Sequence, residues 1–350
     1  MTTIIGGGIA GIALAGALAR AQDKVTLYEQ QSAGSAGGGA FLFLDQRGHD
    51  ALTGLGLDRD ALHAASHPVH GLDYTNSAGV HSSRMGQGHR FWLRRNLIGV
   101  LTEFLDGSGT EVLAGAAVTN VTLDGGAAVV HRGGETIAID SLLIGADGID
   151  SVVRAGLEPH RRPTYAGDVV LYGMTTAGLE LPTPPDVLHF YAEIPELGGL
   201  GSTFGHVWSR AENTTALWFL RIPRPPLDAD DLGFRPVGEW ADTVLEAAPS
   251  NREILETLLA LTDSVHVSNA RDVSLEGAAA PSTPVLLVGD SDHAITPAAG
   301  VGARDALEDA LAVYEAVRSA NSTADAMALR RRQILADREQ ARRAIPRPRA

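Results

Sequence analysis

Three glycines near the start of the chain have the spacing of a phosphate-binding turn. Gly6, Gly8 and Gly11 follow a short apolar stretch, residues 3–5, and precede an alanine-rich stretch, residues 12–20, that is typical of a helix. The first glycine allows a sharp turn, the second lets the backbone approach a pyrophosphate, and the third lets the helix pack closely on the sheet. Unpaired N–H groups at the helix N-terminus would bind the phosphates. We therefore favour an adenine dinucleotide site over a glycine turn that binds no ligand.

An acidic residue follows at the distance that such a site requires. Glu29 comes directly after a second apolar strand, residues 25–28, and lies eighteen residues past Gly11. This is close to the spacing of roughly 20 residues at which an acid binds the ribose hydroxyls. A carboxylate there would repel the 2′-phosphate of NADP, which leaves FAD and NAD as candidates. The motif alone does not choose between them.

Two later strands are predicted to end in an aspartate. Residues 142–144 are apolar and run into Gly-Ala-Asp-Gly, and residues 285–288 run into Gly-Asp-Ser-Asp-His. Open α/β sheets bind ligands at the carboxyl ends of their strands. We therefore expect Asp147 and Asp290 to lie near the first glycine turn. The second glycine turn, residues 300–302, would add a receptor for polyol and phosphate groups.

Composition excludes several other classes of function. The chain has 350 residues, of which 44% are hydrophobic, enough for two domains or one large one. A net charge of −14 argues against nucleic acid and against an anionic membrane surface. There is no cysteine, so disulfides, iron–sulfur clusters and cysteine nucleophiles are excluded. The twelve histidines are scattered, and we predict no metal site. We expect a cytoplasmic protein, monomer or homodimer, without a transmembrane helix.

The remaining pattern predicts an α/β fold with an inserted domain. Residues 159–284 are richer in proline and aromatic residues, and we predict a mostly antiparallel sheet over 168–222 and one or two helices over 236–261. This substrate domain would divide the cofactor domain into residues 1–158 and 285–350. Residues 111–139 alternate as in successive hairpins. The tail, residues 325–343, is predicted to be an arginine-rich helix with a solvated face.

These stretches together resemble the FAD-dependent aromatic hydroxylases of the para-hydroxybenzoate hydroxylase family. The resemblance covers nearly the whole chain in the correct order, and it implies a Rossmann-like FAD-binding domain of the GR2 type. It also implies that the glycine turn holds the FAD pyrophosphate and that Glu29 binds the adenosine ribose. Arg94, which by itself reads equally as a solvated helix start or a phosphate ligand, would contact the cofactor. Asp147 and Gly148 would position FAD and a pyridine nucleotide, and Asp290 would bind the ribityl chain.

The resemblance also places the flavin ring and the adenine. Pro297 and the glycine turn after it would line the isoalloxazine, and Val118 would pack against adenine. The residues expected to bind the cofactor are Gly6, Gly8, Ile9, Ala10, Gly11, Glu29, Gln30, Arg94, Val118, Asp147, Gly148, Asp290, Pro297, Gly300, Val301 and Gly302.

The chain departs from the family pattern beside the expected flavin. Ser291 and Asp292 stand where many members have two alanines, and Arg304 stands where an asparagine usually follows the glycine turn. The extra acid and the extra base would either pair with each other or bind an anionic substrate.

The resemblance implies hydroxylation of an electron-rich aromatic or polyketide-like molecule with FAD, NADH or NADPH, and molecular oxygen. FAD would supply the redox chemistry, and the protein would hold the substrate against it and exclude water. A phenolic substrate would also benefit from a general base. The candidates by location are Tyr172, His189, Tyr191 and His206, none of which the sequence favours over a packed or surface role.

Three alternative functions remain open at this stage. The same fold would also suit a flavin reductase or dehydrogenase acting on an isoprenoid, or a halogenase. Residues 218–223, Trp-Phe-Leu-Arg-Ile-Pro, partly echo a halogenase signature, but the only lysine, Lys24, lies in a loop before the second strand. A flavin-binding protein without turnover is the third alternative.

Overall fold

A parallel sheet near the N-terminus forms the centre of the cofactor-binding region. The computed structural model describes residues 1–32, 41–195, 201–211, 215–296 and 300–344. Five strands, all parallel, pair in the order β19-β12-β1-β2-β8. Their bounds are β1 Thr2–Ile5, β2 Val25–Glu29, β8 Glu111–Ala114, β12 Leu142–Gly145 and β19 Val285–Leu287. From β1 the chain first adds β2 and β8 on one side and later adds β12 and β19 on the other, so the sheet has a switch point beside β1.

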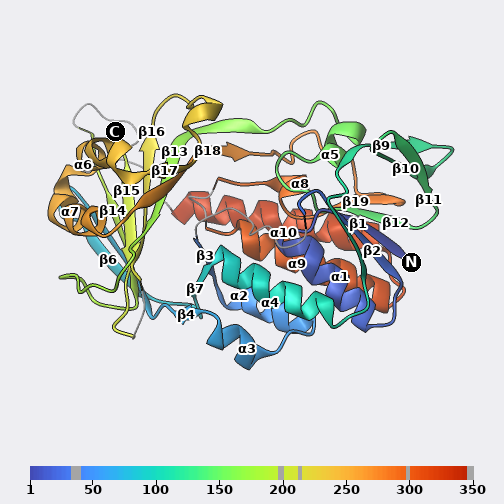
Figure 1. Ribbon diagram of the computed structural model, residues 1–350, viewed down its shortest axis with the longest axis horizontal. Helices are drawn as coiled ribbons and strands as arrows, with labels where there is room; N and C mark the ends of the chain where they lie inside the picture. The colour runs from blue at the N-terminus through green and yellow to red at the C-terminus, as the bar shows by residue number, and fades with distance from the viewer. Residues whose placement is uncertain (33–40, 196–200, 212–214, 297–299, 345–350) are drawn as a thin grey trace.

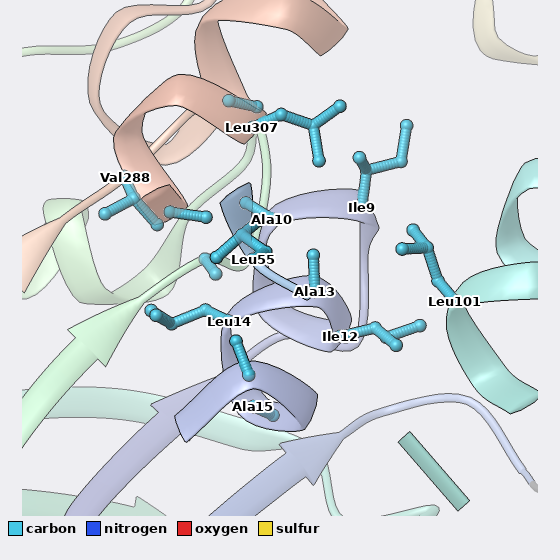
Figure 2. Close-up of a cluster of buried hydrophobic side chains, with 14 of the residues drawn as sticks. Ile9, Ala10, Ile12, Ala13, Leu14, Ala15, Leu55, Leu101, Val288 and Leu307 are labelled. Atoms are coloured by element: carbon cyan, nitrogen blue, oxygen red, sulfur yellow. The ribbon is translucent and has the colours of Figure 1, made fainter. Parts of the chain in front are cut away.

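Helices cover one face of this sheet (Figure 1). The covering helices are α1 Ile9–Arg20, α2 Gln46–Gly54, α4 Arg94–Asp106, α9 Gly302–Arg318 and α10 Thr323–Ala344. Every residue of α1 from Ile9 to Ala19 is buried, as expected of a helix that is apolar on all sides. In Figure 2 the side chains of α1 lie among Leu55, Leu101, Val288 and Leu307. Helix α1 is therefore enclosed by neighbours, and its small side chains let them approach.

A small antiparallel sheet covers the other face. It consists of β9 Val118–Asp124, β10 Ala127–Arg132 and β11 Glu135–Ile139, with α5 Val152–Leu157 packed beside it. The predicted hairpins are confirmed for this part. Strand β8 is different, because it pairs in parallel with β2 and a left-handed turn at Gly115, with φ +68°, then redirects the chain.

A second large sheet lies at the other end of the molecule (Figure 1). Its eight strands pair in the order β17-β18-β13-β16-β15-β14-β5-β6, antiparallel except for the pairing of β14 with β5. The predicted antiparallel sheet is thus confirmed, but β5 and β6 come from outside residues 159–284. The strand bounds are β5 Gly71–Asn76, β6 His81–Met85, β13 Thr164–Met174, β14 Val187–Ala192, β15 Thr203–Val207, β16 Leu217–Pro223, β17 Gly233–Pro236 and β18 Ser264–Asp272.

The two faces of the eight-stranded sheet are covered differently. Helices α6 Ala241–Ala247 and α7 Arg252–Ala260 pack on one face, over a core that contains Trp208 and Trp218. The opposite face packs against a three-stranded sheet of β3, β7 and β4, in that order. The bounds of these strands and of the remaining short helices are β3 Phe41–Leu44, β4 His67–Pro68, β7 Arg90–Leu93, α3 Arg59–Ala64 and α8 Asp290–His293.

The predicted C-terminal helix is present, but its arginine face is not simply solvated. Arg330 is 6% exposed and bonds to a carboxylate on α9, while Arg331 and Arg338 bond to α8. The expectation of a solvated face is wrong for these three residues, because buried acceptors on α8 and α9 receive their N–H groups. Within the described parts of the chain, no helix combines the length and the hydropathy needed to cross a membrane.

Candidate functional site

The four expected strand ends meet at one edge of the parallel sheet. Because the strands are parallel, Gly6, Glu29, Asp147 and Gly289 lie at or just beyond the carboxyl ends of β1, β2, β12 and β19. Ala146 donates its N–H to the carbonyl of Ile5, so the Asp-Gly turn runs directly beside the glycine turn. This edge contains the sheet's switch point, where open α/β sheets bind their ligands.

The glycine turn is packed so tightly that side chains would not fit at two of its positions. A Cβ at Gly6, whose φ is +106°, would lie 2.4 Å from the carbonyl oxygen of Ala146, and a Cβ at Gly11 would lie 1.9 Å from that of Gly6. At Gly8 the nearest atom beyond the neighbouring residues, within the described part of the chain, would be 4.0 Å away. The first and third glycines are thus required by the protein's own packing. The second is open, as the approach of a pyrophosphate requires.

Glu29 is fixed against this turn by backbone donors. Its Oε2 accepts the N–H of Gly7 at 2.5 Å, and its Oε1 accepts the N–H of Gln31 at 2.7 Å. The Glu29 carbonyl accepts the N–H of Ala116, which brings the segment before Val118 next to the end of β2. Gln30 is exposed beside Glu29. The arrangement places the predicted ribose and adenine residues side by side.

Asp147 carries a buried oxygen without a protein partner. Its Oδ2 accepts the N–H groups of Val152 and Val153 at 2.8 and 3.2 Å, at the start of α5. Its Oδ1 is buried and has no hydrogen-bond partner among the described residues. Burial raises the pKa of Asp147, and hydrogen bonding by the Ser151 side chain and by the two backbone N–H groups opposes the rise. Gly148, with φ +80°, then turns the chain away. An unsatisfied buried acceptor indicates room for a donor from a ligand.

Asp290 extends from the end of β19 into the same region. Its surface is accessible to solvent, yet surrounding protein raises its pKa by desolvation, and the positive charges of His293 and Arg94 oppose the rise. A Cβ at Gly302 would lie 3.7 Å from Oδ1 of Asp290, so the second glycine turn faces this carboxylate. Gly300 has φ +65°. The predicted Val301 lies between these two glycines, and Pro297 falls outside the described residues.

Arg94 influences both the eight-stranded sheet and the edge of the parallel sheet where the four strand ends meet. We call this edge the dinucleotide edge. Arg94 is the first residue of α4 and half-buried, and it has no hydrogen bond or ion pair within the part of the chain that the structure describes. Its positive charge opposes the rise that burial causes in the pKa of Asp290, and it adds to the effect of burial in lowering the pKa of His266 on β18. Arg94 therefore lies within electrostatic reach of both regions, with its guanidinium available to a ligand.

These residues fit FAD. The open position at Gly8, the unpaired oxygen of Asp147 and the accessible Asp290 would supply the pyrophosphate and polyol contacts that the cofactor needs. Glu29 would hold the ribose hydroxyls. Among the described residues, no group of three or more His, Cys, Asp or Glu side chains could hold a metal ion.

Aromatic side chains gather where the eight-stranded sheet packs against the sheet of β3, β7 and β4. We call this group the aromatic wall and define it as Phe41, Phe43, Tyr172, Phe190 and Phe219. Phe41 packs edge-on against both Phe43 and Tyr172, with ring centroids 5.8 and 5.4 Å apart, and Phe190 meets Phe219 at 5.9 Å. The sequence reasoning did not find this role for Phe41 and Phe43. The alternation Phe-Leu-Phe-Leu, which puts both phenylalanines on one face, was the available signal.

Three of the four candidate bases lie on the opposite face of that sheet. His189 lies between Leu188 and Phe190, whose side chains are on the face of the sheet that carries the aromatic wall. Side chains alternate along a strand, so the His189 ring points to the other face. There it stacks on His206 at 5.0 Å, and burial lowers the pKa of His206 to about 3. Tyr191 stacks on His206 as well. These three residues therefore do not face the same space as Asp290.

Tyr172 is the one candidate base on the aromatic wall. It is half-buried between Phe41 and His266, and burial raises the pKa of its hydroxyl. A phenol with a raised pKa stays protonated at neutral pH. Tyr172 is therefore suited to donate a hydrogen bond to a substrate, not to remove a proton from one.

The unusual residues after Asp290 do not pair with each other. The Oγ of Ser291 bonds to the carbonyls of Gly145 and Val288, at the ends of the paired strands β12 and β19. The carboxylate of Asp292 pairs with Arg161 and Arg331. Arg304 instead pairs with Asp45 and Asp305. The expected pairing of the extra acid with the extra base is wrong, because both find partners on other elements. Neither charge remains free for an anionic substrate.

Replacing Glu29 with alanine is expected to weaken FAD binding about tenfold or more, because the ribose hydroxyls lose a charged acceptor. The measurement is fluorescence titration of apoprotein with FAD. Glu29→Gln is the matched control, since it keeps an oxygen that can accept from Gly7. An alanine variant that binds FAD as tightly as the wild type would contradict the ribose role.

Comparison with known proteins gives a consistent result. Residues 1–333 match the model of a family described as FAD binding domain. The 2-heptyl-3-hydroxy-4(1H)-quinolone synthase of Pseudomonas aeruginosa is 29% identical over 329 residues, covering 89% of this chain and 79% of that protein. Salicylate hydroxylase of Pseudomonas putida is 28% identical, covering 88% of this chain and 74% of that protein.

Solved structures share the fold at lower identity. HpxO of Klebsiella pneumoniae, determined in complex with FAD and uric acid, superposes with a TM-score of 0.73 and 21% identity. The match covers 94% of this chain and 83% of that chain. At this identity the likeness supports the fold alone.

Proposed function

Since the chain belongs to the FAD-binding domain family over residues 1–333, we propose that it is an FAD-dependent monooxygenase. It would use NADH or NADPH and molecular oxygen to hydroxylate an aromatic or polyketide-like small molecule. The similar quinolone synthase and salicylate hydroxylase support this class of reaction. We further propose that residues 1–158 and 285–350 form the FAD-binding domain and residues 159–284 the main part of the substrate domain.

One observation carries the proposal. Arg94, at the start of α4, lies within electrostatic reach of both Asp290 and His266 on the eight-stranded sheet. The His266 ring lies 6.5 Å from that of Tyr172, the polar member of the aromatic wall. The residue expected to hold the ribityl chain and a surface suited to an aromatic ring are therefore both near one arginine. This is the juxtaposition that a flavin enzyme of aromatic compounds needs.

When bound, FAD supplies electron transfer and oxygen activation. The chain's own residues then have three tasks. The glycine turn and Glu29 anchor the adenosine diphosphate half, while Asp290 and Arg94 orient the other half. The aromatic wall packs on the substrate and keeps water out, which matters because water diverts the activated oxygen. Tyr172 donates a hydrogen bond that orients a polar substituent.

The halogenase alternative is not favoured by its motif. Trp218, the first residue of the partial signature, is fully buried in the core beneath α6 and α7. Its Nε1 donates to Thr262 at 3.1 Å, so this tryptophan has a structural role. The chain's only lysine, Lys24, lies next to β2.

The test of the proposed function combines flavin content with product analysis. Purified protein should bind FAD, and anaerobic NADH or NADPH should bleach its flavin absorbance. Admission of ¹⁸O₂ with candidate aromatic compounds should then yield a product that carries one ¹⁸O atom. If the flavin is reduced but oxygen yields only hydrogen peroxide with every compound tested, the result would favour a reductase. A protein that takes up no FAD would refute the proposal entirely.

A further inference from the structure

We propose that Asp292 is a positioning residue of the flavin site. Its buried carboxylate ties the turn that carries Asp290 to the C-terminal helix α10 and to both chain crossovers between the two large sheets. The inference rests on the proposed function only where turnover is measured. Flavin affinity tests it separately.

The Asp292 carboxylate is fully buried and shared by two guanidinium groups. Its side chain is 0% exposed, and Arg331 of α10 donates to both of its oxygens at 2.7 Å. Arg161 donates to Oδ1 at 3.2 Å. A carboxylate in this position must be paired, because an isolated buried charge is strongly unfavourable. The bidentate bond to Arg331 also fixes the direction in which α8 meets α10.

Arg161 connects this carboxylate to the outgoing crossover, which runs from α5 to β13. Its Nη1 also donates to Glu158 at 2.5 Å, and its Nε donates to the carbonyl of Ser274 at 3.2 Å. Ser274 belongs to the returning crossover, residues 273–284, which runs from β18 to β19. Arg161 therefore contacts both segments that pass between the sheets.

The returning crossover is held a second time at Ala279. Its N–H donates to Glu158 at 2.5 Å, and its carbonyl accepts from Arg331 at 2.5 Å. The charges of this cluster balance, with Glu158 and Asp292 against Arg161 and Arg331. Removal of Asp292 would leave an excess of positive charge in a largely buried region next to Asp290.

The short helix α8 needs this support because it does not satisfy its own carbonyls. A helix of four residues has no following turn to donate to them. Arginine side chains donate to the carbonyls of all four residues of α8 instead. Arg154 donates to the carbonyls of Asp290 and Ser291, Arg161 to that of Asp292, and Arg338 to that of His293. Asp292 orients Arg161 within this set, so its charge acts on the backbone that presents Asp290.

The experiment compares FAD affinity with stability of the apoprotein in Asp292→Asn. The amide keeps the size of the side chain and removes its charge. We expect the FAD dissociation constant to rise about tenfold or more while the apoprotein still unfolds cooperatively, because the turn is present but misaligned. The bound flavin should also be more fluorescent or altered in its absorbance, and less product should form per NAD(P)H oxidised.

Charge rescue distinguishes positioning from general damage. Arg331→Met alone should also weaken FAD binding, while the Asp292→Asn/Arg331→Met pair should recover part of the loss, because charge balance is restored. Asp337→Asn is the matched control. It is an acid-to-amide change on the same helix, and Asp337 pairs with Arg47 and Arg304, not with α8. It should leave FAD affinity unchanged.

Wild-type FAD affinity in Asp292→Asn would overturn the inference. A loss of affinity in the double variant that equals the sum of the losses in the two single variants would overturn it as well. If Asp292→Asn is not obtained folded, Arg331→Lys serves in its place, because it keeps the charge and removes the bidentate geometry. Arg331→Lys should then weaken FAD binding, and a wild-type dissociation constant would overturn the inference. Wild-type protein that binds FAD but oxygenates nothing would refute the proposed function and leave this inference standing.

Discussion

Gly11→Ala is expected to weaken FAD binding severely by disrupting the glycine turn itself. The added Cβ would lie 1.9 Å from the carbonyl oxygen of Gly6, a backbone atom that has no rotamer to change. Either α1 moves off the sheet or the turn opens, and both destroy the pyrophosphate site. We expect the FAD dissociation constant to rise at least about 100-fold, which corresponds to about 2.7 kcal/mol. The apoprotein should also lose stability, by about 1–3 kcal/mol as in overpacked cores.

Gly8→Ala separates ligand binding from packing at the same turn. Among the described residues beyond its chain neighbours, a Cβ there would meet no atom closer than 4.0 Å, so the apoprotein should keep its stability. The methyl group would instead occupy the space that the pyrophosphate needs, and FAD affinity should fall strongly. The two variants thus differ in their effect on apoprotein stability. Gly11→Ala changes both stability and affinity, and Gly8→Ala changes affinity alone.

Gly99→Ala is the control for both variants. Gly99 lies in α4, and a Cβ there would have open space around it. Alanine should stabilise an exposed helix position slightly, by up to about 1 kcal/mol, without affecting FAD. Thermal unfolding of apoprotein and titration with FAD measure all three variants. Unchanged FAD affinity in Gly8→Ala would contradict the pyrophosphate assignment, and a stable Gly11→Ala apoprotein would contradict the packing argument.

The dinucleotide edge was predictable because its signals are local. The glycine spacing, the acid at Glu29 and the two strand ends at Asp147 and Asp290 each follow from a few consecutive residues. Parallel pairing then brings strand ends together whatever lies between them in the sequence. The same reasoning fails for the eight-stranded sheet. Strand β5 pairs with β14, more than a hundred residues later, and no local pattern specifies such a pairing.

The charge network around α8 was not predictable for a related reason. An arginine-rich helix reads as solvated when its own sequence is considered, since its buried acceptors lie on other elements. Arg331 meets Asp292, thirty-nine residues away, and Arg161 meets the same carboxylate from 131 residues away. The departure at Asp292 was visible in the sequence, but its partners were not. Which face of β14 carries His189 likewise depends on register, which only pairing fixes.

Asp309→Asn should destabilise the protein by about 3 kcal/mol and should do so in a pH-dependent way. Asp309 is fully buried and accepts three hydrogen bonds, from the N–H of Gly289 at 2.9 Å, from Nε2 of His293 at 2.6 Å and from Nε of Arg330 at 3.0 Å. The amide leaves Arg330 with Glu308, which is partly exposed, in place of a fully buried counter-ion. It also weakens the support of the turn before Asp290, so FAD affinity should fall as well.

The direction of the pH dependence follows from the two pKa shifts. Burial alone would lower the pKa of His293, but the Asp309 carboxylate outweighs it, and the pKa lies above the ordinary 6.5. Burial alone would raise the pKa of Asp309, but His293 outweighs it, and the pKa lies below the ordinary 3.8. A raised pKa contributes stability that is complete below the unfolded value and is lost as pH rises through the folded value. The lowered pKa contributes stability that is complete above its unfolded value and is lost as pH falls through the folded one.

The ion pair should therefore stabilise the fold most between about pH 4 and pH 6.5, and its contribution should decline as pH rises through the raised pKa of His293. The stability difference between wild type and Asp309→Asn should be larger at about pH 6 than at about pH 9. Thermal or urea unfolding of the apoprotein at both pH values measures it. Asp337→Asn, whose carboxylate is 35% exposed, should show a smaller loss at both. A difference that grows with pH would mean that His293 is neutral in the folded protein, and the turn before Asp290 would then be held by hydrogen bonds without an ion pair.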